Sequence, residues 1–430
     1  MKVYINPPQK EWDEIIRRPV IDWKNIQSVV EPILQKVKAE GDRAVIELTE
    51  KFDKIKLTEL AVKETELKKS AARLDEALKQ AIRTAVRNIS LFHKEQQTPL
   101  KKIETMPGVV CWRKQIPIEK VGLYVPGGTA PLFSTLLMLG IPAKIAGCQE
   151  IILCSPPDKN GNLHPAILFT ADLLEIKKVF KVGGAQAIAA MAYGTETVPK
   201  VYKIFGPGNQ YVTAAKQLVS MEGAAIDLPA GPSEVAVLAD DQADPAFIAV
   251  DLLSQAEHGP DSQVILITNS EKVIKQTQDE IEKQLKDLPR KSFVEKSLAE
   301  SKAVCFDSLD DMMKLVNLYA PEHLILNIAN ASQLAEMVVN AGSVFIGAFT
   351  PESAGDYASG TNHTLPTNAY ARNYSGVSLD SFIKQVTFQE ITKKGLRQIG
   401  PAIEEMAEAE GLQAHRNAVR IRLKKIKDQE

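Results

Sequence analysis

From about residue 119 the chain alternates short apolar runs, rich in β-branched residues, with segments of helical periodicity. The first such runs are KVGLYVPGG, EIILCSP and KKVFKVGG. After the connection AIDLPAGPSE a second series begins, with EVAVLAD, QVILIT, HLILNI and GSVFIG. Strands that alternate with helices form parallel sheets whose faces the helices cover. The pattern therefore predicts an α/β fold in which two units follow one another.

The length of 430 residues exceeds the size at which a single hydrophobic core keeps growing, so we expect two or more domains. Residues 25–105 carry helical spacing and are predicted to be mainly helical. Residues from about 380 to the end are polar, and we expect a helical segment there. Its basic stretch HRNAVRIRLKKIKDQE is interpreted as a solvated helix face, with subunit contact as the alternative.

The charge balance indicates small-molecule partners. With 52 basic and 54 acidic side chains the net charge is -2, which provides no general field to attract nucleic acid or anionic lipid. The start, MKVYINPPQKEWDE, lacks the apolar core of a signal peptide, and no apolar stretch is long enough to span a bilayer. We therefore expect a cytoplasmic protein with no membrane or nucleic-acid partner.

The four cysteines show no CxxC spacing. Cys154 lies inside the apolar run EIILCSP, which favours a buried, reduced thiol over a disulfide or a nucleophile.

Four of the six histidines lie in short segments that also carry carboxylate or amide side chains. In LLSQAEHGPDSQ, Gln255 and His258 are three residues apart in the last turn of a predicted helix, which begins at Asp244-Pro245 and is stopped by Gly259. Both side chains can then reach one ion. The alternative is a helix C-cap in which His258 bonds the last carbonyls.

Glu322 and His323 interrupt the apolar stretch NLYAPEHLILN, just before a predicted strand. Neighbouring strand residues point in opposite directions, so the backbone must bend if both side chains serve one reaction from the same side. An acid and a base in an apolar context can have pKa values near neutrality, which suits proton transfer. A charged turn next to Pro321 is the alternative.

Asp356 lies in the small-residue segment SAGDYASGTNHTLPT, which we interpret as a ligand-binding loop at the carboxyl end of the strand SVFIG. His363 in the same segment could contact substrate or only cap the loop, and we favour a supporting role. His415 in AEGLQAHRN is a further candidate ligand, because imidazole, carboxylate and amide oxygen together make a plausible metal site.

Three glycine turns, VPGGTAP, VGGAQA and FGPGN, each close a predicted strand and precede a predicted helix. Helix N-termini bind phosphates, so a dinucleotide is a natural ligand. The chain has no complete GxGxxG motif with a downstream acidic residue, so the motif evidence for a dinucleotide is weak, and the glycines could be purely geometric.

Taken together, GLYVPGG, VGGAQAIAA, FGPGN, DLPAGPSE, LLSQAEHGPDSQ, APEHL, ESAGDYASGTNH and EGLQAH closely resemble the histidinol dehydrogenase family. The resemblance covers most of the chain. It implies a zinc enzyme of histidine biosynthesis that oxidises L-histidinol through L-histidinal to L-histidine with two NAD+. It also implies two incomplete Rossmann-like parallel-sheet domains with small helical extensions at both ends.

The resemblance further implies roles for individual residues. One zinc per subunit would be held by Gln255, His258, Asp356 and His415, and the proton acceptors would be Glu322 and His323. NAD would contact Tyr124, Gln186 and Asn209. Substrate would contact a larger set, which consists of Ser233, Gln255, His258, His323, Asp356, Glu410 and His415.

Members of the family are homodimers with shared active sites, and the expected domain limits follow from the same likeness. They are a small N-terminal segment 1–21, a first α/β domain 22–123 with 234–377 that carries most of the metal site, a second, NAD-contacting α/β domain 124–233, and a C-terminal segment 378–430 that crosses to the partner.

Two competing functions remain open from the residues alone. A zinc hydrolase with Glu322 as general base would use similar ligands. A metal-stabilised scaffold is less consistent, because structural zinc sites are usually rich in thiolates.

Overall fold

The computed structural model describes residues 1–18, 23–127, 131–229 and 231–429. It divides into two compact units, which we call unit 1 (Met1–Gln96 with Ile118–Phe382) and unit 2 (Gln97–Pro117 with Ile383–Glu430). Across the described ranges, no helix is both long enough and apolar enough to cross a membrane.

Unit 1 contains a five-stranded parallel sheet with the order β6-β5-β4-β7-β8. Its strands are β4 (Lys120–Tyr124), β5 (Glu150–Ser155), β6 (Lys178–Lys181), β7 (Lys203–Phe205) and β8 (Ala225–Ile226). The connecting helices are α6 (Phe133–Ala146), α7 (Pro165–Leu173), α8 (Gly184–Tyr193) and α9 (Gln210–Met221). These apolar runs are buried on both faces, as expected for parallel strands under helices.

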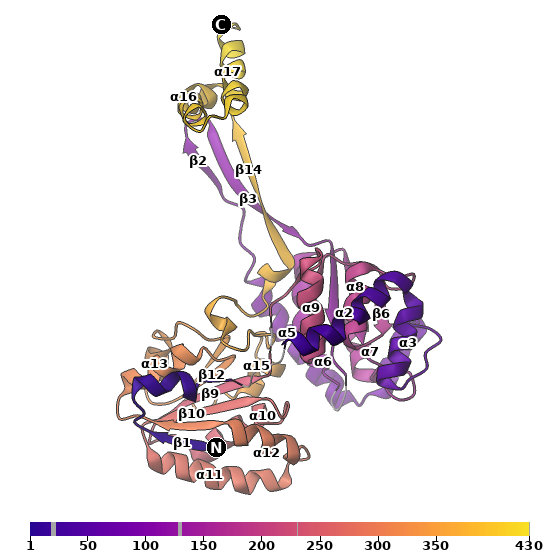
Figure 1. The fold of residues 1–430 in the computed structure, drawn as a ribbon, viewed down its shortest axis with the longest axis vertical. Helices are drawn as coiled ribbons and strands as arrows, with labels where there is room; N and C mark the ends of the chain where they lie inside the picture. Colours follow the sequence, from indigo (N-terminus) through magenta and orange to yellow (C-terminus); the bar gives the residue numbers. More distant parts are fainter. Residues whose placement is uncertain (19–22, 128–130, 230, 430) are drawn as a thin grey trace. The chain divides into compact units, whose positions relative to one another are not determined.

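The helices predicted before residue 105 are present, and several of them cover this sheet. They are α2 (Trp23–Glu40), α3 (Asp42–Asp53), α4 (Glu64–Lys69) and α5 (Glu76–Lys94). Helix α2 packs on α8 and α9, and α5 packs on α6 (Figure 1). The limits predicted for the domains stay a prediction, since unit 1 holds this sheet and the next one together.

The second sheet of unit 1 has six parallel strands in the order β1-β11-β10-β9-β12-β13. Its strands are β1 (Lys2–Ile5), β9 (Glu234–Ala239), β10 (Gln263–Thr268), β11 (Lys302–Cys305), β12 (His323–Asn327) and β13 (Ser343–Ile346). Its helices are α1 (Trp12–Ile15), α10 (Pro245–Ala256), α11 (Glu271–Gln284), α12 (Lys291–Glu300), α13 (Leu309–Tyr319), α14 (Ala331–Ala335) and α15 (Glu352–Tyr357). The α/β class with two parallel sheets is confirmed.

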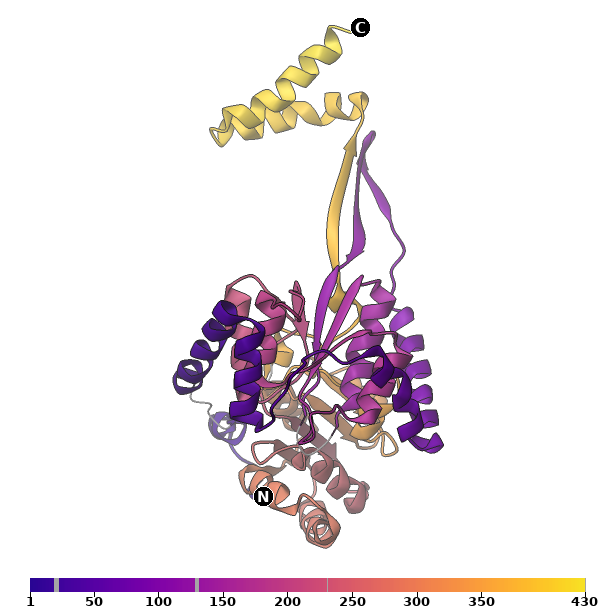
Figure 2. The ribbon, with the colours of Figure 1, turned by 90° about the vertical axis from the view of Figure 1, so that its right-hand side faces the viewer.

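Unit 2 is a three-stranded antiparallel sheet followed by a helix pair. Strand β3 (Val109–Pro117) pairs with β2 (Lys102–Met106) and, over its full length, with β14 (Ile383–Ile391). Helices α16 (Lys393–Ala409) and α17 (Gln413–Lys427) lie against each other (Figure 2).

The expectation of helix from about residue 380 is wrong for β14 and correct for α16 and α17. The segment IKQVTFQEI carries β-branched and aromatic residues and finds its partner in a strand more than 260 residues earlier, a pairing that local periodicity does not reveal.

Candidate active site

Glu322 and His323 meet at the main chain of Glu234, the first residue of β9. The N–H of Glu234 donates to Glu322 Oε2 at 2.8 Å, and His323 Nδ1 lies 3.1 Å from the carbonyl oxygen of Glu234. Strand β12 begins only at His323, and the backbone bends at Glu322. Because of this bend the two side chains approach each other, with 3.6 Å between Glu322 Oε2 and His323 Nδ1. Both are buried.

Helix α10 delivers Gln255 to the same place. The helix starts at Pro245 with Asp244 as N-cap, as predicted, but it ends at Ala256, so the expectation that His258 lies in its last turn is wrong. With its amide oriented to satisfy both atoms, Gln255 accepts a hydrogen bond from the N–H of Glu234 at 2.9 Å and donates to Glu352 at 2.5 Å. Gln255 is therefore joined to the Glu322–His323 pair through Glu234.

Asp356 lies on the short helix α15, so its assignment to a loop is wrong. The helix starts at Glu352, directly after its N-cap Pro351, and carries Glu352 and Asp356 one turn apart. Asp356 Oδ1 is 3.7 Å from His323 Nε2. The cluster thus gathers at the amino ends of β9 and β12, where Glu234 and His323 lie, and the expected placement at a carboxyl strand end is also wrong.

His258, Glu352 and Asp356 offer ligand atoms that all lie within 4.8 Å of one another. Their donor set, one imidazole and two carboxylates, is suitable for a divalent cation such as zinc. This arrangement favours the metal-ligand interpretation of His258 over the helix C-cap. Sequence reasoning missed Glu352, although its position four residues before Asp356 would place both on one face of a helix.

The electrostatics of the cluster are set by its carboxylates. Burial lowers the pKa of His323, but Glu322, Glu352 and Asp356 together outweigh it and raise that pKa well above its usual value. Burial raises the pKa of Glu352 well above its usual range. Among the described residues, Glu352 Oε2 and His323 Nε2 are buried with no hydrogen-bond partner, so two atoms of the cluster remain free to bind a ligand.

His363 and Ser233 lie on segments next to the cluster. Burial lowers the pKa of His363. The charge of Asp356 opposes this shift, and His323 adds to it. Its Nε2 is a buried atom with no partner among the described residues. Ser233 directly precedes β9, and its carbonyl oxygen accepts the N–H of Gln263 at 3.0 Å. Substrate roles for Ser233 and His363 stay predictions.

Glu410 and His415 lie in unit 2, whereas the cluster residues described so far lie in unit 1. Glu410 is the C-cap of α16 and His415 is in the first turn of α17, so the turn at Gly411 carries both. Both side chains are exposed.

The three residues expected to contact NAD lie at the carboxyl ends of strands in the five-stranded sheet or on the helices that follow. Tyr124 ends β4, and its hydroxyl accepts the N–H of Gly184 at 3.1 Å. Gln186 lies in the first turn of α8 and is buried. Asn209 caps α9, with its side chain accepting the N–H groups of Tyr211 and Val212 at 3.1 Å each. The carboxyl edge of a parallel sheet is a usual place for a dinucleotide.

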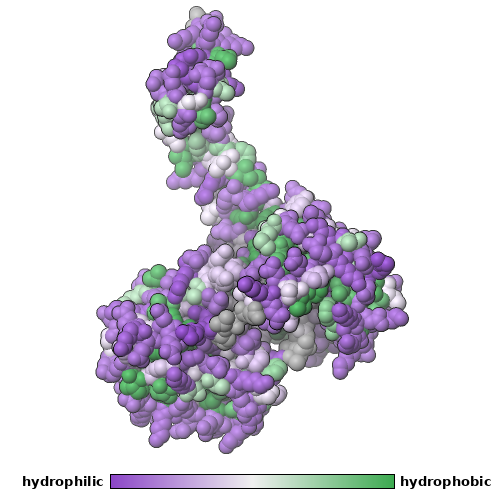
Figure 3. Space-filling view, viewed as in Figure 1, coloured by the Kyte–Doolittle hydropathy of each residue, from purple (hydrophilic) through white to green (hydrophobic). Residues whose placement is uncertain are grey.

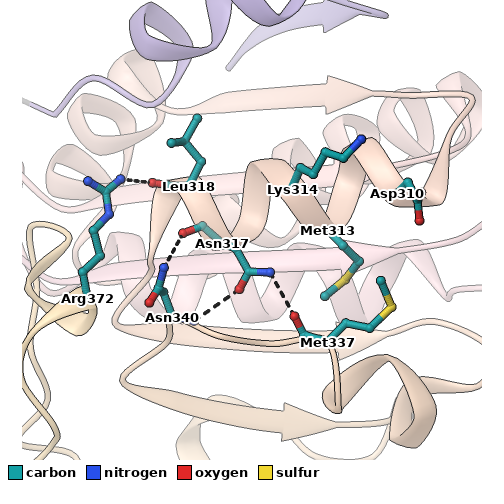
Figure 4. A pocket seen from close by; sticks show the side chains of 8 residues that line it. All are labelled: Asp310, Met313, Lys314, Asn317, Leu318, Met337, Asn340 and Arg372. Carbon is teal, nitrogen blue, oxygen red and sulfur yellow. Dashed lines mark hydrogen bonds between the residues drawn. The ribbon is translucent and has the colours of Figure 1, made fainter.

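A surface pocket of unit 1 lies elsewhere and contains none of these residues. It is lined by Asp310, Met313, Lys314, Asn317, Leu318, Met337, Asn340 and Arg372 (Figure 4). Its amides bond to main-chain carbonyls, with Asn317 donating to Met337 and Asn340 donating to Asn317, both at 3.0 Å.

Three comparisons with known proteins agree. The family model described as histidinol dehydrogenase matches residues 16–423. The histidinol dehydrogenase of Bacteroides thetaiotaomicron is 60% identical over 427 residues, which cover 99% of this chain and 100% of that protein. That of Vibrio cholerae is 54% identical over 97% of each chain. The crystal structure of histidinol dehydrogenase from Elizabethkingia anophelis is 56% identical, with a TM-score of 0.97 over 99% of each chain.

Proposed function

The chain belongs to the histidinol dehydrogenase family, and from that premise we propose that it oxidises L-histidinol through L-histidinal to L-histidine with two molecules of NAD+. It is an oxidoreductase of histidine biosynthesis. The observation that carries the two-step proposal is the Glu322–His323 pair, an acid and a base held by the main chain of one residue. The N–H of Glu234 donates to Glu322 at 2.8 Å, and the carbonyl oxygen of Glu234 lies 3.1 Å from His323 Nδ1.

Zinc would be held by Gln255, His258 and Asp356, with Glu352 beside them and His415 as a fourth ligand. The fit rests on the convergence of His258, Glu352 and Asp356 within 4.8 Å and on the free, buried Oε2 of Glu352. When bound, zinc would hold and orient the substrate and could not itself be oxidised or reduced.

His323 would accept the proton of the substrate hydroxyl in the first oxidation, through its partnerless Nε2. Its Nδ1 is occupied at the carbonyl of Glu234, and this fixes which nitrogen faces the substrate. A bound cation would partly neutralise the three carboxylates that raise the pKa of His323, so less of the ring would already be protonated when the substrate binds.

Glu322 would act in the second oxidation. An aldehyde must add water before a second hydride can leave, and a buried carboxylate near the reacting carbon can take the proton of that water. A cysteine thiohemiacetal is the other chemical route to an acid. Burial raises the pKa of Cys148 to about 12 and raises that of Cys154 further, which makes both poor nucleophiles.

NAD would bind at Tyr124, Gln186 and Asn209 and accept the hydride at each oxidation. The glycine turns before α8 and α9 support this placement, because both helices direct main-chain N–H groups to the carboxyl edge of the sheet.

We also infer that the active unit is a homodimer whose sites are shared. Apolar side chains are exposed near the cluster, namely Val250 on α10, Tyr357 on α15 and, in the turn before α15, Phe349 with 90% of its surface accessible. In unit 2, Ile103, Phe388 and Ile391 are exposed along the strands, and Figure 3 shows apolar residues at the surface there. Such surfaces are typical of contacts between subunits. Glu410 and His415 of the partner subunit would then complete the site.

The deciding experiment counts the NADH formed per L-histidinol consumed by the purified protein, with a chelator-treated sample alongside. Two NADH and loss of activity with chelator are expected. One NADH would mean that the aldehyde escapes and that Glu322 has no such role. No NADH from zinc-replete protein would contradict the dehydrogenase proposal and favour a hydrolase.

A further inference from the structure

Unit 1 contains a buried ion pair that the proposed chemistry does not use. Lys216, on α9, contacts Asp227, which follows β8, and their side chains are only 5% and 1% exposed. Burying two charges carries a large desolvation cost, and an apolar pair of similar size often stabilises a protein equally well. The placement of this pair therefore calls for a function besides stability.

Both charged groups hold the same residue, Gly206. The N–H of Gly206 donates to Asp227 Oδ2 at 2.7 Å, while its carbonyl oxygen accepts from Lys216 Nζ at 2.9 Å. Gly206 has a φ of +131°, and a Cβ there would lie 2.0 Å from the carbonyl oxygen of Tyr124. The peptide groups on both sides of Gly206 are thus fixed against the end of β4 by one ion pair.

Gly206 begins the turn Gly206-Pro207-Gly208-Asn209, which leads from β7 into α9. A Cβ at Gly208 would lie 2.4 Å from Val212 Cγ1, so the turn approaches the first turn of the helix closely. Asn209 is thereby held between the fixed Gly206 and the helix that it caps. Because Lys216 lies on that helix, the ion pair ties the turn and α9 into one rigid element.

We propose that Lys216 and Asp227 are positioning residues for the dinucleotide site, and that they set the conformation in which the turn and the N-terminus of α9 receive NAD. The proposal rests on the function proposed above, in which Asn209 contacts NAD. It predicts a selective effect, because the Lys216–Asp227 ion pair holds the turn beside the five-stranded sheet, whereas Glu234 and His323 belong to the six-stranded sheet.

The test compares Lys216→Met, Asp227→Asn and the double variant with the zinc-loaded wild type. Lys216→Met leaves a buried carboxylate unpaired and is expected to lower the melting temperature, whereas the double variant removes both charges and is expected to recover most of it. The KM for NAD+ should stay raised about tenfold or more in the double variant, with the KM for L-histidinol within about twofold of wild type.

Lys203→Met is the matched control, since Lys203 is a partly buried lysine at the start of β7 whose charge also acts on Asp227, but it bonds the carbonyl of Ser381 at 2.8 Å and does not hold Gly206. It should leave the KM for NAD+ unchanged. Recovery of a normal KM for NAD+ together with the melting temperature in the double variant would overturn the positioning role, and so would an equal rise in both KM values.

Asn209→Ala separates this proposal from the one on which it rests. A normal KM for NAD+ in Asn209→Ala would mean that the dinucleotide site itself is misplaced. A raised KM for NAD+ in Asn209→Ala with a normal KM for NAD+ in the double variant would mean that the dinucleotide site is correctly placed but does not need the Lys216–Asp227 ion pair.

Discussion

Arg18 and Glu234 form a buried ion pair whose acidic member also carries, on its main chain, the hydrogen bonds of Glu322 and His323. Arg18 Nη2 donates to Glu234 Oε2 at 2.8 Å and to the carbonyl oxygen of Tyr319 at 2.8 Å. The Glu234 carboxylate also accepts the N–H of Asn368 at 2.8 Å. A single residue therefore connects the segment before α2 with the proposed acid and base.

Replacing Arg18 with Met should destabilise the protein and lower kcat together. The change leaves the buried carboxylate of Glu234 without its cation, which costs about 3–5 kcal/mol of unfolding free energy. Urea unfolding and steady-state kinetics measure the two effects. Arg17→Met, an exposed neighbour, is the control and should be within about 0.5 kcal/mol of wild type. Adding Glu234→Gln should recover part of the loss, and no recovery would argue against the ion pair as its cause.

Replacing Glu322 with Gln should reduce the oxidation of L-histidinal far more than that of L-histidinol. The amide keeps the size of the side chain but cannot take a proton from water, so a loss of about 10²–10⁴-fold is expected in the aldehyde step. Each half-reaction is followed separately by NADH formation from the alcohol or the aldehyde. Equal losses in both would contradict the assignment of Glu322 to the second oxidation.

Replacing Glu352 with Gln should weaken zinc binding by about 10–100-fold, the range seen when a carboxylate beside a metal site is lost. The carboxylate lies within 4.8 Å of the ligand atoms of His258 and Asp356, and its Oε2 is free. Zinc content after dialysis against a graded chelator measures the effect. Glu257→Gln supplies a matched control, since Glu257 lies between Gln255 and His258 in sequence but outside that ligand group. Equal zinc retention by both variants would remove Glu352 from the site.

The fold was predictable where local sequence decides it. Alternating apolar and helical segments predicted both parallel sheets, and Asp244-Pro245 predicted the start of α10. Strand β14 was not predictable in this way, because its partner β3 lies far away in sequence and only the pairing makes its polar pattern a strand. The short helix α15 was hidden by glycine and serine, residues that usually indicate a loop.

The candidate site was predictable as a set of residues but not as a geometry. The resemblance named Gln255, His258, Glu322, His323 and Asp356, and the structure brings these together in unit 1. The central position of Glu234 could not be foreseen, because it acts through main-chain N–H and C=O groups that every residue has. Its contacts depend on the register of β9 and β12, in which His323 lies opposite Val235.

His93 should make the stability of the protein depend on pH. It is fully buried on α5, with Nδ1 2.9 Å from the carbonyl oxygen of Ile89 and Nε2 without a partner among the described residues. Burial lowers the pKa of His93 below that of an unfolded histidine, which is about 6.5. The folded state therefore prefers the neutral ring.

The stability that this preference contributes is complete above the unfolded pKa and is lost as pH falls below it, because only the unfolded chain then takes up the proton. One proton corresponds to a slope of at most about 1.4 kcal/mol per pH unit. His93→Leu should thus lose less unfolding free energy than wild type between pH 7.5 and 5.5, when both are unfolded in urea at the same zinc concentration. Subtracting the pH dependence of one protein from that of the other cancels the contribution of the histidines that they share. Phe92→Leu, which changes the exposed neighbour without a titrating group, should keep the wild-type slope, and the same slope in His93→Leu would show that His93 is not responsible.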